Sequence, residues 1–143
     1  MNNIYYRLKD LREDNDFTQE KVCRFLNVKR STYSKWENGE NEPPFKIFVL
    51  LSSLHKININ YLLGNTNIKQ KINYIPKYNQ IYISKLFRKI RVKNNHTQTE
   101  LANILKCNKT TICNYESGYR KIPTYKLVYF CEFYKIDIEN FIR

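Results

Sequence analysis

Apolar residues in the first part of the chain recur every three or four positions, which is the spacing of one face of an α-helix. A turn at 27–28 precedes a third segment that closes at Asn38-Gly39, and 44–55 and 59–63 predict two more helices. We therefore expect five short helices, with Thr18 as the N-cap of the second. The apolar positions of the first two helices are Ile4, Leu8 and Leu11, then Val22, Phe25 and Leu26.

This pattern occurs twice. With an offset of 79 residues, positions 4–64 align with 83–143 without a gap, and KRSTYSKWENG at 29–39 returns as NKTTICNYESG at 108–118. The second copy has a full capping box, Thr97 with Glu100, where the first has Lys21 in place of the glutamate. We predict an all-α chain of two tandem five-helix domains, 1–64 and 81–143, joined by a polar linker at 65–80.

Two short helices joined by a tight turn form the helix-turn-helix pattern. The runs TQEKVCRFLNVKRSTYSKWENG and TQTELANILKCNKTTICNYESG resemble the phage-repressor or Cro-like (XRE-type) helix-turn-helix family. The resemblance implies a sequence-specific regulator of transcription, a repressor, whose partner is double-stranded DNA. It places recognition helices 30–37 and 109–116 in the major groove, where each base pair presents its own pattern of donors and acceptors.

The resemblance also implies which residues contact DNA. Gln19 and Gln98 are expected at a phosphate, and the loop after the second recognition helix borders the DNA backbone. The remaining candidates lie on or beside the exposed face of each recognition helix. The candidate DNA-binding residues are Gln19, Lys29, Arg30, Ser31, Ser34 and Lys35 in the first copy, and Gln98, Asn108, Lys109, Thr110, Cys113, Asn114, Tyr119, Arg120 and Lys121 in the second.

Other repeated residues favour structural roles. Tyr33 and Trp36 lie three positions apart and are expected to pack in the core, as are Ile112 and Tyr115, rather than to stack on bases. The resemblance suggests that the repeated Arg and Glu residues form internal ion pairs between the first and third helices. These pairs are Arg12 with Glu37 and Arg91 with Glu116.

The charge of the chain agrees with a polyanionic partner. Its 25 basic and 13 acidic residues give a net charge of +12 and a pI of about 9.6. The first copy is close to balanced, whereas the second is strongly basic, and the loop after the recognition helix is Glu-Asn-Glu at 40–42 but Tyr-Arg-Lys at 119–121. We expect the second domain to anchor the chain on DNA.

Several classes of function find no support in the sequence. The isolated histidines and the three glycines form no catalytic motif or phosphate-binding loop, so we expect neither an enzyme nor a cofactor. The four cysteines lack metal-ligand spacing, so no metal site is expected. No apolar run is long enough for a membrane span, and no signal peptide is evident, so a cytoplasmic location is expected.

Some alternatives stay open. Helix-turn-helix domains also act as protein-interaction or inhibitor modules, as in antitoxins and phage inhibitors, and basic ones bind RNA. The acidic loop of the first copy favours a protein partner for domain 1. A homodimer is also open, although a linker of 16 residues, reaching roughly 50 Å when extended, lets one chain act as its own pair of DNA-binding domains.

Overall fold

The computed structural model describes the backbone of residues 4–143 and the side chains from Arg7 onward. The chain forms two compact units, Met1–Pro76 (unit 1) and Lys77–Arg143 (unit 2). The described residues form helices and one isolated β-bridge, which confirms the all-α class. None of the helices in this part of the chain is long and apolar enough to cross a membrane. The predicted contribution of Ile4 to a buried face lies outside the described side chains.

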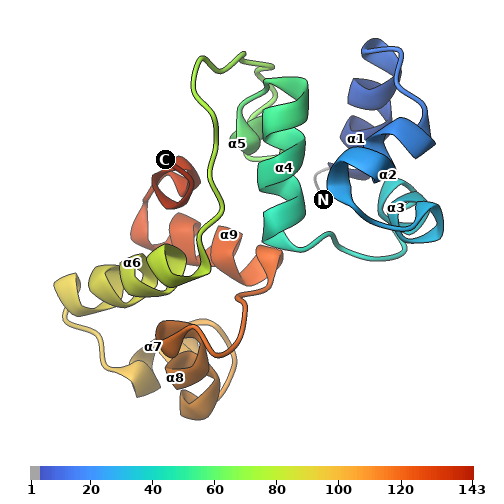
Figure 1. The fold of residues 1–143 in the computed structure, drawn as a ribbon. Coiled ribbons are helices and arrows are strands. Elements are labelled where there is room, and N and C mark those ends of the chain that lie inside the picture. The colour runs from blue at the N-terminus through green and yellow to red at the C-terminus, as the bar shows by residue number, and fades with distance from the viewer. Residues whose placement is uncertain (1–3) are drawn as a thin grey trace. The chain divides into compact units, whose positions relative to one another are not determined.

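Unit 1 has the five helices that the apolar pattern predicts (Figure 1). The second helix begins at the predicted cap, because the Thr18 hydroxyl accepts a hydrogen bond of 3.1 Å from the backbone N–H of Lys21. The third helix has the predicted bounds. The helices are α1 (Ile4–Asp14), α2 (Gln19–Leu26), α3 (Arg30–Glu37), α4 (Phe45–His55) and α5 (Ile59–Leu62).

Unit 2 repeats this order with one change. Its last element is a 3₁₀ turn, where a fifth α-helix is expected. The predicted capping box is present: the Thr97 hydroxyl accepts from the Glu100 N–H, and the Glu100 carboxylate accepts from the Thr97 N–H. The elements are α6 (Gln80–Lys93), α7 (Gln98–Ile104), α8 (Lys109–Ser117), α9 (Thr124–Tyr134) and η1 (Ile138–Phe141).

The turns repeat as closely as the helices. Each non-glycine residue with a positive φ in unit 1 has a counterpart 79 positions later, although the residue type differs within every pair except one. Such a backbone is costly for side chains other than Asn and Asp, so the fold imposes it at these positions. The pairs are Asp16 and Asn95, Asn27 and Lys106, and Lys56 and Lys135, all with φ between 54° and 59°.

Each unit has its own core, in which aromatic side chains pack edge to face. Tyr33 and Trp36 are buried in unit 1, with ring centroids 6.3 Å apart. Unit 2 buries Tyr115 at the position of Trp36, edge to face with Phe87 at 6.2 Å, and Phe87 also stacks on Phe130 at 4.3 Å. The prediction that these recognition-helix aromatics belong to the core is confirmed.

The predicted buried face of α2 is wrong in one position. Phe25 is 48% exposed, whereas Cys23 is buried beside Val22 and Leu26. In a helix with 3.6 residues per turn, Cys23 and Phe25 lie equally far from the centre of the face formed by Val22 and Leu26, on opposite sides of it. The spacing of the four apolar residues in this helix therefore allows either Cys23 or Phe25 to be buried, and the structure buries the smaller side chain.

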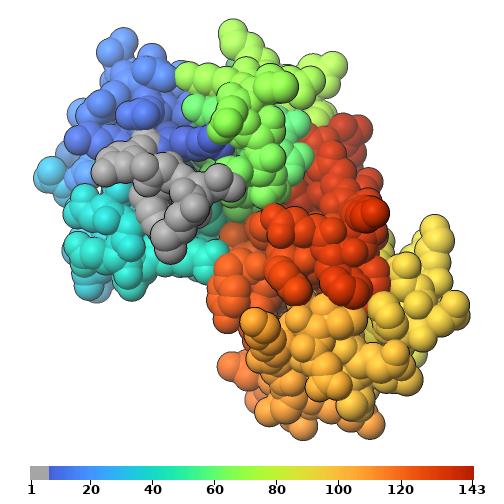
Figure 2. Space-filling view, turned by 180° about the vertical axis from the view of Figure 1, so that it is seen from behind, coloured from blue at the N-terminus to red at the C-terminus, as the bar shows by residue number. Residues whose placement is uncertain are grey.

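The residues predicted as a linker, 65–80, are divided between the two units. The N–H of Asn58 donates to the carbonyl of Gln70 at 2.8 Å, and the N–H of Ile72 donates to that of Lys56 at 3.0 Å. In Figure 2 the green residues of this region lie against the blue residues near the N-terminus of unit 1. Bonds to unit 2 begin at Lys77, whose N–H donates to the carbonyl of Ile142 at 2.7 Å.

Candidate nucleic-acid interface

The pair α2 and α3 in unit 1, like α7 and α8 in unit 2, forms a helix-turn-helix, and a buried arginine fixes its orientation. Arg12 on α1 donates two hydrogen bonds to the carboxylate of Glu37 on α3, of 2.6 and 3.2 Å. Its third bond, of 3.0 Å, goes to the carbonyl of Phe17 in the turn before α2. One guanidinium therefore joins α1, the turn and α3.

Unit 2 builds the same junction. Arg91 on α6 donates bonds of 2.5 and 3.2 Å to the carboxylate of Glu116 on α8. It also donates to the carbonyl of His96 at 2.7 Å, in the turn before α7. The repeated Arg and Glu residues thus act between elements inside each unit and leave the outer face of the third helix for other contacts.

The electrostatics of the pair in unit 1 depend on burial. The Glu37 side chain is 3% exposed and that of Arg12 is 12% exposed. Burial alone would raise the pKa of Glu37, but hydrogen bonds from Arg12 and Gln19 outweigh it and hold that pKa below its usual value. The same bond to Glu37 raises the pKa of Arg12. Both groups are therefore charged at neutral pH.

A glutamine extends each ion pair toward the face of the recognition helix. The Nε2 of Gln19 donates to Glu37 at 3.0 Å, and its Oε1 accepts from Arg30 at 3.2 Å. The Nε2 of Gln98 donates to Glu116 at 2.8 Å. Its Oε1 accepts instead from the thiol of Cys113 at 3.0 Å. The two units therefore position different residues of the recognition helix.

The candidate DNA-binding residues all have solvent access. Gln19, Gln98, Ser34, Cys113 and Asn114 are half-buried. The exposed members are Lys29, Arg30, Ser31 and Lys35 in unit 1, and Asn108, Lys109, Thr110, Tyr119, Arg120 and Lys121 in unit 2.

Asn108 has a structural role that the sequence interpretation missed. It is the N-cap of α8, and its Oδ1 accepts bonds of 2.8 Å from both the N–H and the hydroxyl of Thr111. Lys29 occupies the same place before α3 and makes no side-chain cap bond. A side chain that caps its helix has fewer groups left for DNA, and the Asn-x-x-Thr spacing was the signal that could have found this.

The surroundings of the two recognition helices differ in charge. A polar hollow at the start of α2 is lined by both signs of charge, with Glu13 and Glu20 among its carboxylates. Their counterparts in unit 2 are Val92 and Thr99. Together with the loop at 40–42, these residues form what we call the acidic rim of unit 1: Glu13, Glu20, Glu40 and Glu42.

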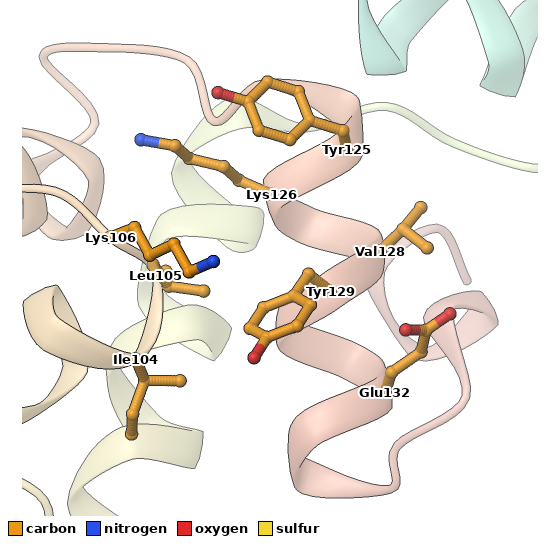
Figure 3. A pocket seen from close by; sticks show the side chains of 8 residues that line it. All are labelled: Ile104, Leu105, Lys106, Tyr125, Lys126, Val128, Tyr129 and Glu132. Carbon is orange, nitrogen blue, oxygen red and sulfur yellow. The ribbon is translucent and has the colours of Figure 1, made fainter.

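Unit 2 also has a hollow, which lies between the end of α7 and α9 (Figure 3). It contains none of the candidate DNA-binding residues, and Tyr125 and Tyr129, one turn apart on α9, are 59% and 46% exposed. Its lining residues are Ile104, Leu105, Lys106, Tyr125, Lys126, Val128, Tyr129 and Glu132.

Comparison with known families agrees with this architecture. A helix-turn-helix family model matches residues 8–62 and again residues 87–141. The two matches cover most of the chain, and each contains one complete helix-turn-helix with the arginine and glutamate that hold it. The chain belongs to the helix-turn-helix family, as two tandem copies.

Several individual relatives come from Bacillus subtilis. The HTH-type transcriptional regulator YobD is 30% identical over 61 residues, which is 43% of this chain and 54% of YobD. The SPbeta prophage-derived HTH-type transcriptional regulator YonR is 30% identical over 69 residues, 48% of this chain and 64% of YonR. The HTH-type transcriptional regulator ImmR is 29% identical over 65 residues, 46% of this chain and 51% of ImmR. Each match spans less than two thirds of the relative, and no solved structure matches the chain.

Proposed function

We propose that this chain is a sequence-specific regulator of transcription that binds double-stranded DNA with α3 and α8 in the major groove. One observation carries the proposal: both units hold the third helix with the same largely buried pair of arginine and glutamate, which a half-buried glutamine extends, and both leave its polar outer face accessible. The relatives YobD, YonR and ImmR are named as transcriptional regulators. The proposed activity is binding, without catalysis.

The outer faces favour unlike half-sites. Arg30 and Lys35 on α3 suit the two acceptors of guanine, whereas Asn114 on α8 suits the donor and acceptor of adenine. The hydrogen bond from Arg30 to Gln19 orients its guanidinium, which reduces the entropy lost on binding a base. The target is therefore a site whose two halves differ in sequence.

The charges favour unit 2 as the anchor. Arg120 and Lys121 follow α8 and are exposed, whereas Glu40 and Glu42 of the acidic rim follow α3. Contacts to phosphate supply most of the affinity that does not depend on sequence. Unit 2 is therefore expected to hold the DNA backbone more strongly than unit 1.

Selection from random duplex DNA, followed by sequencing, tests the proposal. The wild type is expected to enrich a motif with two halves, and Lys109→Ala/Asn114→Ala is expected to lose sequence preference in one half. The control, Lys135→Ala/Asn140→Ala, removes the same charge and one amide from exposed positions of unit 2 away from α8. Binding without any motif, unchanged in the α8 variant, would contradict the proposal and indicate RNA or a protein as the partner.

The regulator is proposed to act as a repressor, in line with its resemblance to phage repressors. A reporter gene with the selected site placed over its promoter tests this. Expression is expected to fall when the wild-type chain is present and to recover with Lys109→Ala/Asn114→Ala. A rise in expression with the wild type would identify an activator instead.

The acidic rim supports a second candidate function for unit 1, which is contact with a basic protein surface. Glu20 and Glu13 are both exposed, although Glu20 also pairs with Arg24 at 3.0 Å. Such a contact is compatible with DNA binding by unit 2, and it would make the chain a module that inhibits or recruits a protein. Charge reversal on the rim that leaves DNA binding intact but abolishes regulation would favour this candidate.

A further inference from the structure

Residues 66–72, which we call the strap, follow α5 and are bound to unit 1 by backbone hydrogen bonds. The N–H of Asn58 donates to the carbonyl of Gln70 at 2.8 Å, and the N–H of Ile72 donates to that of Lys56 at 3.0 Å. Between these bonds lies the isolated antiparallel bridge of Ile57 with Lys71. The strap therefore runs beside the turn between α4 and α5 as a short two-stranded pairing.

Side chains fasten the strap to α1 as well. The guanidinium of Arg7 donates to the carbonyls of Tyr61 and Thr66 and, at 2.6 Å, to the Oδ1 of Asn67. Near the other end of α1, Asp14 pairs with Lys69 at 2.8 Å. The strap is thus held at both ends of the helix that carries Arg12.

The chain enters unit 2 only a few residues later. The N–H of Lys77 donates to the carbonyl of Ile142 at 2.7 Å. Asn79 then caps α6 by accepting from the N–H of Tyr82 at 3.0 Å, and the amide of Gln80 donates to the carbonyl of Arg120 at 3.3 Å. Every residue from Lys77 onward is part of unit 2.

Residues 73–76 lie between the backbone bond of Ile72 to unit 1 and that of Lys77 within unit 2. Four residues between fixed ends span at most about 18 Å, compared with roughly 50 Å for all of 65–80 when extended. Pro76 shortens the range further, because it fixes its own φ and restricts Ile75 to extended conformations. The strap therefore removes most of the reach of the linker.

We propose that the strap determines the spacing of the DNA half-sites that one chain can bind. A linker that cannot span two sites gives no gain from binding both, whereas one that matches the distance gives the largest gain. By holding 66–72 on unit 1, the strap restricts the chain to operators whose half-sites lie within a narrow range of separations. The inference rests on the proposed function of α3 and α8 in binding DNA.

The test uses duplexes that carry the two selected half-sites at separations increased in steps of one base pair, up to one helical turn. The wild type is expected to lose about 100-fold in affinity when the separation grows by a full turn, because the second contact is lost. A variant with eight Gly and Ser residues inserted between Pro76 and Lys77 is expected to lose only a few-fold, since its linker can span the longer site.

A second variant tests the strap by loosening its attachment to unit 1. Arg7→Ala/Lys69→Ala removes the side-chain fastening but keeps the backbone bonds of Asn58 and Ile72, so its tolerance of the longer separation is expected to lie between that of the wild type and that of the insertion variant. Its control, Lys46→Ala/Lys71→Ala, removes the same two charges at exposed positions and keeps the bonds of Arg7 and Lys69. The control is expected to behave as the wild type. If wild type and insertion variant tolerate separation equally, the spacing role is wrong while the proposed DNA binding stands.

Amide hydrogen exchange of the protein without DNA tests whether the strap is bound to unit 1. The N–H groups of Asn58 and Ile72 are expected to exchange at least ten times more slowly than those of the exposed residues Asn73 and Ile75 in the wild type, because the former donate to the strap pairing. Equal rates would overturn the inference, since the strap would not be bound. Slow exchange combined with no bipartite site would overturn the proposed function and the spacing role together, while leaving the strap as a structural part of unit 1.

Discussion

His55 is a buried histidine at the end of α4 whose counterpart in unit 2 is a tyrosine. It stacks on Phe17, with ring centroids 6.1 Å apart, and its Nδ1 lies 3.2 Å from the amide nitrogen of Asn15. In unit 2 the two residue types are exchanged: His96 replaces Phe17, and its Nδ1 lies 2.7 Å from the hydroxyl of Tyr134. The histidine of this contact thus comes from the fourth helix in unit 1 and from the turn before the second helix in unit 2.

Burial, with a smaller effect from the charge of Lys69, lowers the pKa of His55 from 6.5 to about 4. Between these values the unfolded chain binds a proton that the folded unit does not. The free energy of unfolding of unit 1 is therefore highest above pH 6.5 and is expected to fall by about 3 kcal/mol as the pH falls to 4. Urea unfolding followed by the fluorescence of Trp36, the single tryptophan, measures this in unit 1.

The control is His55→Tyr, which places in unit 1 the residue that unit 2 has at this position. Acidic residues will give both proteins some dependence on pH, so the prediction concerns the difference between them. The wild type should lose more stability than His55→Tyr between pH 6.5 and 4. Parallel curves for the two proteins would mean that His55 is protonated in the folded state.

The ion pair of Arg12 with Glu37 provides a second prediction at the scale of single residues. Glu37→Ala leaves the Arg12 charge largely buried without its carboxylate, so it is expected to lower the free energy of unfolding by about 3–5 kcal/mol. Glu20→Ala breaks a pair whose side chains are each 76% exposed, so it should cost less than about 1 kcal/mol. Urea unfolding measured through Trp36 compares the two, and similar losses would show that Glu37 is more hydrated than its 3% exposure indicates.

At the scale of elements, the turn inside each helix-turn-helix carries a left-handed residue. It is Asn27 in unit 1 and Lys106 in unit 2, with φ of 55° and 54°. Asparagine tolerates this conformation better than lysine does. Lys106→Gly is therefore expected to stabilise unit 2 by about 0.5–1 kcal/mol, and Asn27→Gly to change unit 1 by a few tenths.

Amide exchange of core residues checks this prediction, because it measures each unit separately. Protection at Leu101 and Ile112 should rise in Lys106→Gly, and protection at Val22 and Tyr33 should stay nearly constant in Asn27→Gly. If both substitutions destabilise their units equally, the entropy of the unfolded chain dominates over the strain of the turn.

Much of this fold could be predicted from the sequence, because short amphipathic helices leave a clear apolar period. The bounds of α3 and the capping box of α7 follow from local signals such as Asn38-Gly39 and Thr97 with Glu100. The buried face of α2 was harder, since Cys23 and Phe25 compete within two turns. The last element of unit 2 has the length of α5 but forms a 3₁₀ turn, a difference of hydrogen-bond pattern that residue spacing does not encode.

The missed features depend on contacts between distant residues. The bonds of Arg7 to the carbonyls of Tyr61 and Thr66 cross more than 50 residues and leave no periodic signal. For the same reason the strap was predicted as part of a linker. The repeat did indicate Gln19 and Gln98, but only the structure shows that one accepts from Arg30 and the other from Cys113.

At the scale of the whole molecule, the unequal charge of the two units makes a prediction about affinity. Replacing Glu40, Asn41 and Glu42 by Tyr, Arg and Lys gives unit 1 the loop of unit 2, removing two negative charges and adding two positive ones. Binding to DNA is expected to strengthen, and the slope of log affinity against log salt to steepen by up to about 2. The measurement is a titration of DNA binding at several salt concentrations.

The reciprocal variant is Arg120→Glu/Lys121→Glu, which should weaken binding and make the slope shallower. If this variant loses much more affinity than a variant with the same amount of negative charge added to unit 1, the result would agree with unit 2 as the anchor. If charge reversal at Arg120 and Lys121 leaves affinity unchanged while added negative charge in unit 1 abolishes it, the roles of the two units are the reverse of those proposed.

The exchanged pairs, Phe17 with His55 and His96 with Tyr134, have a consequence for how the chain folds. Two copies of one fold on a single polypeptide give every helix a wrong partner as well as a right one, and such misassembly is a common failure of repeat proteins. If α4 packed against the turn of unit 2, His55 would meet His96. If α9 packed against the turn of unit 1, Tyr134 would meet Phe17. In either case the contact of 2.7 Å between His96 and Tyr134 would be lost. The wrong pairing would therefore lack this hydrogen bond, which favours docking of α9 within its own unit.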